Sequence, residues 1–261
     1  MKISHAMPSV GVGIGGLLLW EGICRFFKVP AYLLPTPSQI FAEIIYNFSS
    51  LATHTAVTVS EALLGFLIAN VCAIALSVCM LYIRHLDRAI MPFAIALKTT
   101  PIVAMAPLLL IWFGTGMAPK VAAAALICFF PALVNSLKGF NALEEGEEDL
   151  FRIYGASKTQ MLLKLRFQRA APYIFSALKV SSSLSIVGAI VGEFVGANKG
   201  IGYVILVASY HFEFARMFAA LFMSAIAGVV FYAAISYFDR KYVFWLVGPV
   251  VEIRLDSPPP R

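Results

Sequence analysis

The chain has 261 residues, of which 60% are hydrophobic and 13% are charged, and its mean hydropathy is +0.84. A soluble domain has about 45–50% apolar and about 25% charged residues, and so short a chain cannot bury the apolar excess in its own core. The composition therefore excludes an ordinary soluble domain and favours a protein surrounded by membrane lipid. The net charge of +6 is spread between apolar runs rather than gathered with aromatic residues on a polar face, so we expect no nucleic-acid partner.

The first apolar run, residues 9–27, follows Lys2, and a signal peptide is one interpretation of this pattern. Trp20 and Glu21 stand where a cleavage site would need small residues, and more apolar runs come later. We therefore expect this run to be a retained first span.

A short amphipathic helix is expected next, near residues 38–48, after the rigid sequence Pro35-Thr36-Pro37. Ile40, Ile44 and Ile45 are spaced to share one face of that helix. An apolar face on a short helix between two spans predicts that it lies on the membrane surface.

Six apolar runs are long enough to cross about 30 Å of hydrocarbon, which takes about 20 helical residues. They are continuous rather than alternating, so a barrel is excluded and helices are expected. The fold class predicted is an all-α integral membrane protein of about six transmembrane helices, forming one domain over 1–261 with its core at 56–238. The expected spans are 9–27, 56–82, 89–113, 120–139, 172–196 and 216–238.

The distribution of Lys and Arg predicts the orientation. With the N-terminus inside, thirteen of the twenty basic residues fall in inside segments and five in outside segments. Such a bias is typical of both termini lying in the cytoplasm. The five outside residues are Arg25, Lys28, Lys120, Lys199 and Arg216.

Charged side chains within spans are costly and usually face a cavity or a partner. Lys98 precedes Thr99, Thr100 and Pro101, and because proline frees a carbonyl and disfavours helical geometry before it, a polar kink is expected there. Several other polar residues within the spans have more than one interpretation. Glu61 is either part of a structural pair or an interfacial residue, and Lys179 is a side chain that snorkels to the interface. Ser182 is either a polar contact or a packing residue, and Glu193 is either structural or a pathway residue.

Four glycines at 188, 192, 196 and 200 recur every four residues, which would place them on one helix face. Close helix packing is the favoured interpretation, and an unwound end near 196–202 that lines a pathway is the functional alternative. The four cysteines, Cys24, Cys72, Cys79 and Cys128, lie in apolar runs without a metal-binding spacing and are expected to be buried and inert.

The segment 140–171 is the one sizeable polar stretch expected inside the cell. It opens with five acidic residues and continues at helical spacing until Gly155-Ala156 interrupts it. Ser157 and Gln160 fit a capping box that restarts a helix, with Leu162 and Leu165 on its apolar face. A helix, a glycine turn and a second helix with exposed apolar residues favour a docked partner over a plain connector.

This segment resembles the coupling loop of permeases from binding-protein-dependent ABC importers. Asp149 takes the acidic position of that motif, Gly155 its glycine and Leu165 a later aliphatic position, whereas Leu150 and Phe151 replace two alanines and Gln168 a proline. Three other stretches are similar to the subfamily for nitrate, sulfonate, taurine, bicarbonate, thiamine precursors and riboflavin: 107–114, 129–135, and 192–196 with 200–203.

The resemblance implies a transport subunit of a bacterial plasma membrane rather than an enzyme. It implies alternating access, a second and identical permease copy, an external solute-binding protein and cytoplasmic ATPase subunits that hold ATP and Mg²⁺. Consistently, the chain has no Gly-x-x-x-x-Gly-Lys-Ser/Thr loop and needs no cofactor of its own. The implied solute is a small polar or anionic nutrient, either a heterocyclic vitamin precursor or a sulfonate or oxyanion.

The polar residues within the spans and the resemblance together predict two sets of site residues. The expected substrate pathway comprises Lys98, Thr99, Thr100, Ser182 and Glu193, and the expected ATPase-coupling set comprises Asp149, Arg152, Gly155, Ala156, Ser157 and Leu162.

Two other classes of protein were weighed against a permease. An ion-coupled secondary transporter would favour paired intramembrane acids and an inverted repeat. An intramembrane enzyme would need a metal set or a nucleophile–base pair, but His5, His54, His85 and His211 are scattered near expected span ends.

Overall fold

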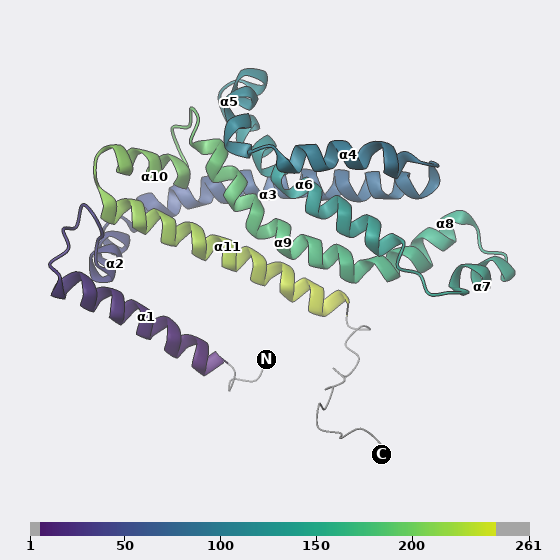
Figure 1. The fold of residues 1–261 in the computed structure, drawn as a ribbon, viewed down its shortest axis with the longest axis horizontal. Helices are drawn as coiled ribbons and strands as arrows, with labels where there is room; N and C mark the ends of the chain where they lie inside the picture. Colours follow the sequence, from purple (N-terminus) through teal and green to yellow (C-terminus); the bar gives the residue numbers. More distant parts are fainter. Residues whose placement is uncertain (1–5, 244–261) are drawn as a thin grey trace, which may run out of the picture.

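Helices are the only regular secondary structure within residues 6–243, the part of the chain that this computed structural model describes (Figure 1). The all-α prediction is therefore confirmed. In chain order the elements are α1 (Ala6–Phe26), α2 (Pro37–Tyr46), α3 (Phe48–Tyr82), α4 (Leu86–Thr99), α5 (Ile102–Phe113), α6 (Ala118–Phe140), α7 (Glu147–Ile153), α8 (Lys158–Met161), the π-helical turn η2 (Leu162–Arg166), α9 (Phe167–Glu193), α10 (Ile201–Tyr210) and α11 (Phe214–Tyr242).

Four of these helical stretches are long and apolar enough to cross a membrane: α3, α6, the run from α8 through α9, and α11. They lie along the long axis of the molecule, with α7 and α8 at one end and α2 and α10 at the other (Figure 1). A fifth span results if the bent pair α4 and α5 is counted as one. The extent of α1 matches the first expected span, and three residues of the orientation count, Lys2, Arg254 and Arg261, lie outside the described residues.

The span predicted over 89–113 is not one helix. It breaks between Thr99 and Ile102, where α4 and α5 meet at a bend of 102°. Pro101 has no N–H to continue the ladder, and Thr100 takes an extended conformation, as expected before a proline. The Thr99 and Thr100 hydroxyls both donate to the carbonyl of Ala96, at 2.9 Å each, and the same carbonyl accepts the Thr100 N–H as the last helical bond of α4. The kink was predicted at this position, but its size was not.

The core of the bundle is the antiparallel pair α6 and α9. A Cβ added at Gly188 would lie 2.6 Å from the Cα of Ala124, and one at Gly192 would lie 2.8 Å from the Cα of Lys120. These two glycines therefore serve close helix packing, as predicted. The other two glycines of the series do not share that face, because α9 ends at Glu193 and Gly196 and Gly200 lie in the unwound segment that follows.

The sequence predicted that Lys120 lies in an outside segment, and this prediction is wrong. Lys120 lies in the first turn of α6, only 6% exposed, with its Nζ 3.5 Å from Oε1 of Glu61 on α3. The structural interpretation of Glu61 is thereby confirmed. Lys179 likewise forms an ion pair with Asp239 of α11, at 2.8 Å, rather than reaching the interface alone.

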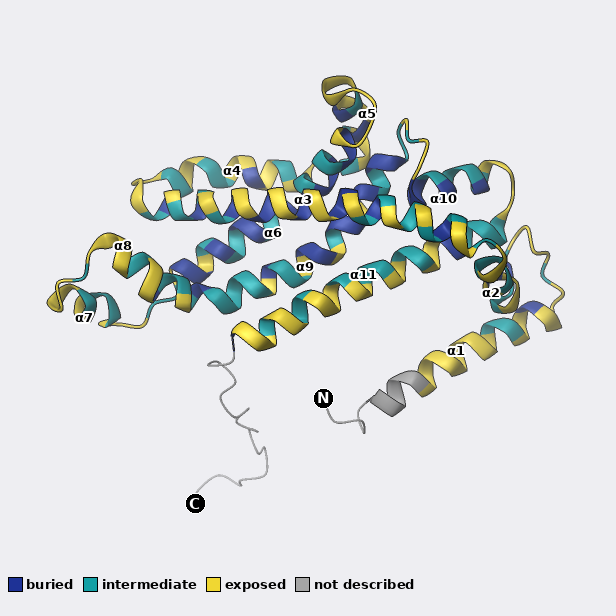
Figure 2. Ribbon diagram, turned by 180° about the vertical axis from the view of Figure 1, so that it is seen from behind, coloured by how far each residue is buried: buried dark blue, intermediate teal, exposed yellow. Residues whose placement is uncertain are grey.

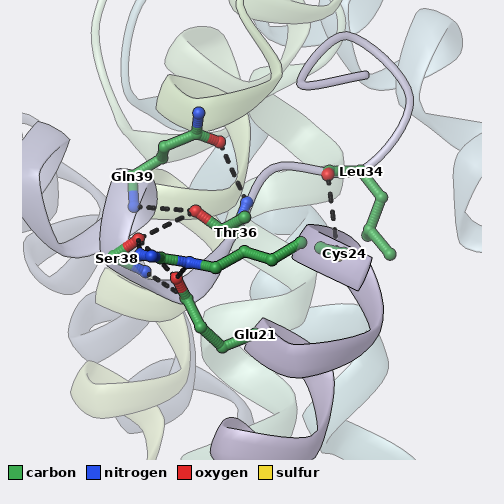
Figure 3. Close-up of polar contacts among 7 residues, drawn as sticks. Glu21, Cys24, Leu34, Thr36, Ser38 and Gln39 are labelled. Carbon is green, nitrogen blue, oxygen red and sulfur yellow. Dashed lines mark hydrogen bonds and ion pairs between the residues drawn. The ribbon is translucent and has the colours of Figure 1, made fainter. Parts of the chain in front are cut away.

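The N-terminal helices are held together by polar contacts (Figure 3). The carboxylate of Glu21 on α1 accepts hydrogen bonds from the Ser38 backbone N–H, at 3.0 Å, and from the Ser38 hydroxyl, at 2.8 Å. It thus caps α2 from outside, next to the capping box formed by Thr36 and Gln39. Ile40 is buried in a cluster with α10 and α11 residues while Ile45 points to another face, so the predicted shared face of the isoleucines is wrong, and the position of α2 on the membrane surface stays a prediction.

The outer faces of α1 and α11 are largely exposed and apolar (Figure 2). Such faces suit lipid or a second membrane chain. Cys72 and Cys79 on α3 are exposed as well, so the prediction of buried cysteines holds only for Cys24 and Cys128.

Candidate functional site

The loop between α6 and α9 contains the predicted helix, glycine turn and restarted helix. α7 ends in a Schellman motif, in which Gly155 N–H donates to Arg152 O at 2.9 Å and Ala156 N–H donates to Phe151 O at 3.0 Å. Gly155 has φ +70°, a conformation that side chains with a Cβ resist, and an added Cβ there would meet no atom within 4 Å. The turn is thus set by the backbone and leaves open space in front of it.

The capping box is also confirmed. The Gln160 N–H donates to Ser157 Oγ at 3.2 Å, and the Ser157 N–H donates to Gln160 Oε1 at 2.8 Å. The helix that it starts is not a separate one, however, because α8 continues through η2 into α9 as a single run, Lys158–Glu193. Within the loop, α7 is therefore the helix that is not continuous with a span.

The most exposed apolar side chains of the loop lie at the C-terminal end of α7, while the helix after the turn exposes Leu163 to 57%. Ile153 is 82% exposed and Tyr154 81%. A cavity of about 330 Å³ lies beside them. Of the apolar residues predicted on the second helix, Leu162 is half-buried and Leu165 is buried in the bundle. The cavity is lined by Leu150, Phe151, Tyr154, Ala156, Gln160 and Lys164.

The charges predicted for this loop lie at its rim. Asp149 has a side chain that is 76% exposed, and Arg152 forms an ion pair with Glu148 one turn earlier at 2.9 Å. The acids Glu147 and Glu148 make a second set of contacts, with Arg169 and Arg166. The Arg169 guanidinium donates to Glu147 and holds the pKa of that carboxyl below its ordinary value. The sequence analysis missed both arginines, although a run of acids followed by two arginines three residues apart was the available signal.

At the opposite end of the bundle, side chains of other helices cap the first turn of α10. The Gly200 N–H donates to His54 Nδ1 at 3.0 Å, and the Ile201 N–H donates to Thr58 Oγ1 at 2.8 Å. The Gly202 N–H donates to the carboxylate of Glu193, which also accepts the Thr58 hydroxyl at 2.6 Å. Three amides without intrahelical partners are therefore satisfied by α3 and α9.

The residues expected to line a pathway do not form one cluster. Lys98, Thr99 and Thr100 are exposed at the α4–α5 break, and the Lys98 ammonium lies 4.7 Å from the centre of the Phe130 ring. Ser182 is fully buried within the bundle and donates to Lys179 O. Glu193 is 1% exposed, and its carboxylate oxygens accept the hydrogen bonds of the α10 cap. This geometry supports a role for Glu193 in holding α10 in place.

No group of three or more potential metal ligands occurs within residues 6–243. Of the histidines in this range, His54 serves the α10 cap.

The chain is similar to known membrane proteins over most of its length. Residues 61–244 match the family described as the binding-protein-dependent transport system inner membrane component. The formylaminopyrimidine transport permease protein ThiX of Halalkalibacterium halodurans is 33% identical over 230 residues, covering 88% of this chain and 92% of that protein. The riboflavin transport system permease protein RibX of Chloroflexus aurantiacus is 32% identical over 243 residues, covering 91% of each chain.

Solved structures with the same fold include a chain from the inward-facing MetNI methionine ABC transporter. It has a TM-score of 0.59 at 17% identity and covers 74% of this chain and 94% of its own. A chain from an amino acid ABC transporter crystallised with histidines gives a TM-score of 0.62 at 14% identity, covering 77% and 98%.

The α10 cap generates a test. Thr58→Val keeps the shape of the side chain but leaves the buried Ile201 N–H and one Glu193 oxygen without a partner, which costs about 1–3 kcal/mol for the unsatisfied group. We expect the amides of 200–204 to exchange with deuterium faster in this variant. Thr53→Val is the control, because Thr53 is exposed on the same helix and bonds only to its own helix. Equal exchange in the two variants would show that Thr58 does not support α10.

Proposed function

Because the chain belongs to the family of binding-protein-dependent transport system inner membrane components, we propose that its α7–α8 loop docks onto an ATP-binding subunit and couples ATP hydrolysis to nutrient uptake. The chain is a permease of an ABC importer for small nutrients and not an enzyme, and ATP is hydrolysed on a separate subunit. Because the chain belongs to this family, the alternative function as an ion-coupled secondary transporter is ruled out. A solute-binding protein is the partner on the opposite side.

The observation that carries the docking proposal is the apolar surface of α7. α7 lies at the end of the molecule beyond the apolar spans (Figure 2), and Leu150, Ile153 and Tyr154 are exposed there. Exposed apolar residues next to a cavity and rimmed by charge are typical of a protein–protein contact. Asp149 and Arg152 provide that rim, and Ser157 and Ala156 shape the turn.

Gly155 offers a direct test of docking. Gly155→Val places a β-branched residue at φ +70°, whereas Gly155→Asn places the residue type that best tolerates this region. A strained residue costs about 1–3 kcal/mol, so we expect roughly five- to hundredfold weaker association with the ATPase for the valine variant. The asparagine variant should bind more tightly than the valine variant. The measurement is co-purification with the co-expressed ATPase and its rate of ATP turnover.

If Gly155→Val assembled normally with the ATPase and its ATP turnover remained coupled to uptake, the docking proposal would be wrong and the loop would be an ordinary connector. Monodisperse elution of the permease alone serves as the control for folding, since the change lies outside the spans.

Orientation and assembly form a second part of the proposal. The α7 end faces the cytoplasm, in line with the excess of Lys and Arg expected there. Two identical copies enclose the path, and support comes from α5, which projects from the bundle (Figure 1) and exposes Ile111 and Trp112 beside an apolar cavity of about 700 Å³. Native mass spectrometry of the assembled transporter would contradict this arrangement if it found one copy of the chain.

The pathway proposal rests on the α4–α5 break. Lys98, Thr99 and Thr100 are polar and exposed in an otherwise apolar region, where contact with lipid would be costly. Non-helical backbone at this depth is tolerated where it lines a cavity or meets protein. We place the solute path of alternating access along this break. Ser182 and Glu193 support the walls from inside the bundle.

The solute is proposed to be a heterocyclic vitamin precursor. Support comes from two relatives above 30% identity, whose names refer to formylaminopyrimidine and riboflavin. Two aliphatic sulfonate permeases, from Bacillus subtilis and Escherichia coli, are 26% and 24% identical.

Thr100→Cys tests the path and the solute class together, in a background with Cys72 and Cys79 replaced by alanine. In the assembled transporter we expect this thiol to react with a membrane-impermeant methanethiosulfonate, because it faces water. Val229→Cys, on the exposed apolar face of α11, is the control and should stay unreactive. Riboflavin or formylaminopyrimidine, presented by the binding protein, should slow the reaction, and taurine should not.

A Thr100→Cys thiol as unreactive as Val229→Cys in every nucleotide state would contradict the path. Protection by taurine alone would contradict the solute class and leave the path intact.

A further inference from the structure

We propose that Glu147 and Glu148 of α7, with Arg169 and Arg166 at the base of α9, form a strut that makes the docking helix and the longest span move as one body. This assignment rests on the proposed docking of α7 to an ATPase. The four residues are positioning residues: they touch neither the partner nor the solute, and they act by fixing the direction of α7.

The contacts of the strut join two segments that are about twenty residues apart. The Arg169 guanidinium donates through Nε to both carboxylate oxygens of Glu147, at 2.9 and 3.1 Å, and a further Nη2 contact links the same groups. Arg166 Nη2 donates to Glu148 Oε2 at 3.0 Å, and its Nη1 donates to the carbonyl of Phe140 at 2.9 Å. Bidentate contacts of this kind fix direction as well as distance. α7 is thereby joined to the end of α6 and the start of α9 at once.

Little else holds α7 in place. It has seven residues, too few for a stable isolated helix, and it buries none of them. Gly146 before it and Gly155 after it both have positive φ, at +86° and +70°, and the hydrogen bonds of the Gly155 turn run back to α7 itself rather than to a span. Without the ion pairs, a push from a partner would turn α7 rather than move the span.

The strut residues are also placed to act together. The side chains of Arg166 and Glu147 are 17% and 21% exposed, so water screens them less than the pairs on the outer face of α7. Glu144 adds a second carboxylate to Arg169 at 3.1 Å. Networks with a well-defined geometry hold better than isolated surface pairs.

The helix that receives the motion runs the length of the molecule. From Lys158 to Glu193 it is one helical stretch of 36 residues, and at its far end Glu193 accepts the Gly202 N–H of α10. A displacement at Arg166 and Arg169 is therefore delivered to the segment 194–200 and to the α10 cap. The π turn η2 lies beside the strut, and such turns are frequent at functional sites.

The test uses hydrogen–deuterium exchange, so it needs no identified solute. In the full-length permease alone, in nanodiscs, the amides of α7 should exchange faster in Glu147→Arg and in Arg169→Glu than in the wild type. The double variant with the charges exchanged should restore wild-type exchange. Glu145→Arg makes the same charge change in the same acidic run, at an exposed residue that has no ion pair within the described part of the chain, and should behave as the wild type.

The wild type, the two single variants and the double variant are then assembled with the ATPase and compared with and without ATP and vanadate. In the wild type, nucleotide should change exchange both in α7 and in 194–200. In each single variant the ATPase should still co-purify, and the change at 194–200 should be lost while that in α7 persists. The double variant should recover the change at 194–200, a rescue that a merely destabilising substitution would not show.

Wild-type exchange of α7 in both single variants would overturn the strut, whatever the ATPase does. So would a double variant that restores neither α7 nor 194–200. Failure of the wild-type permease to bind the ATPase would instead contradict the docking proposal, and exchange of α7 in the permease alone would still decide whether the strut exists.

Discussion

The backbones of α6 and α9 touch, and the position of every functional element described above depends on that contact. In lipid there is no hydrophobic gain in bringing two apolar helices together, so close van der Waals contact has to supply the attraction. Gly188 and Gly192 allow this approach near the α10 end, where an added Cβ would lie 2.6 to 2.8 Å from backbone atoms of α6. Gly139 does the same near the α7 end, against Ala170.

Polar groups mark the two ends of this pair. At one end Lys120 and Glu61 form a buried pair, and Glu193 holds the first turn of α10. At the other end Arg166 and Arg169 bind the acids of α7. Because α9 reaches from one set to the other, a permease built this way has a direct mechanical route from its docking loop to the opposite face. The bend at Pro101 lies to the side of that route and opens the polar break where a solute path is proposed.

Local signals in the sequence were sufficient for several features. The capping box of Ser157 and Gln160, the left-handed turn at Gly155 and the break at Pro101 depend on a few adjacent residues, and all three were predicted. The long apolar runs likewise predicted the helices α3, α6, α9 and α11, because composition alone decides whether a helix of that length suits lipid.

Features that depend on tertiary contact were missed or misjudged. The charge of Lys120 was assigned to an outside segment because nothing nearby in the sequence reveals Glu61, sixty residues away, as its partner. The spacing of Ile40, Ile44 and Ile45 gives an apolar face but not its neighbour, so the packing of Ile40 against α10 and α11 could not be predicted. The contacts of Glu193 with the α10 cap could not be predicted, since its partners, Thr58 and Gly202, come from two other segments.

The contact between α6 and α9 is tested most directly by one pair of variants, Gly188→Ala and Gly228→Ala. Both add a single methyl group to a long apolar helix, but at Gly188 the new Cβ meets the Cα of Ala124, whereas at Gly228 on α11 it meets no atom within 4 Å. Equilibrium unfolding in detergent micelles should show a loss of about 1–3 kcal/mol in unfolding free energy for Gly188→Ala, the usual cost of overpacking. Gly228→Ala should stay within about 0.5 kcal/mol of the wild type, as for other changes away from packed contacts. Equal stability of the two variants would contradict the view that this close packing is what the fold depends on.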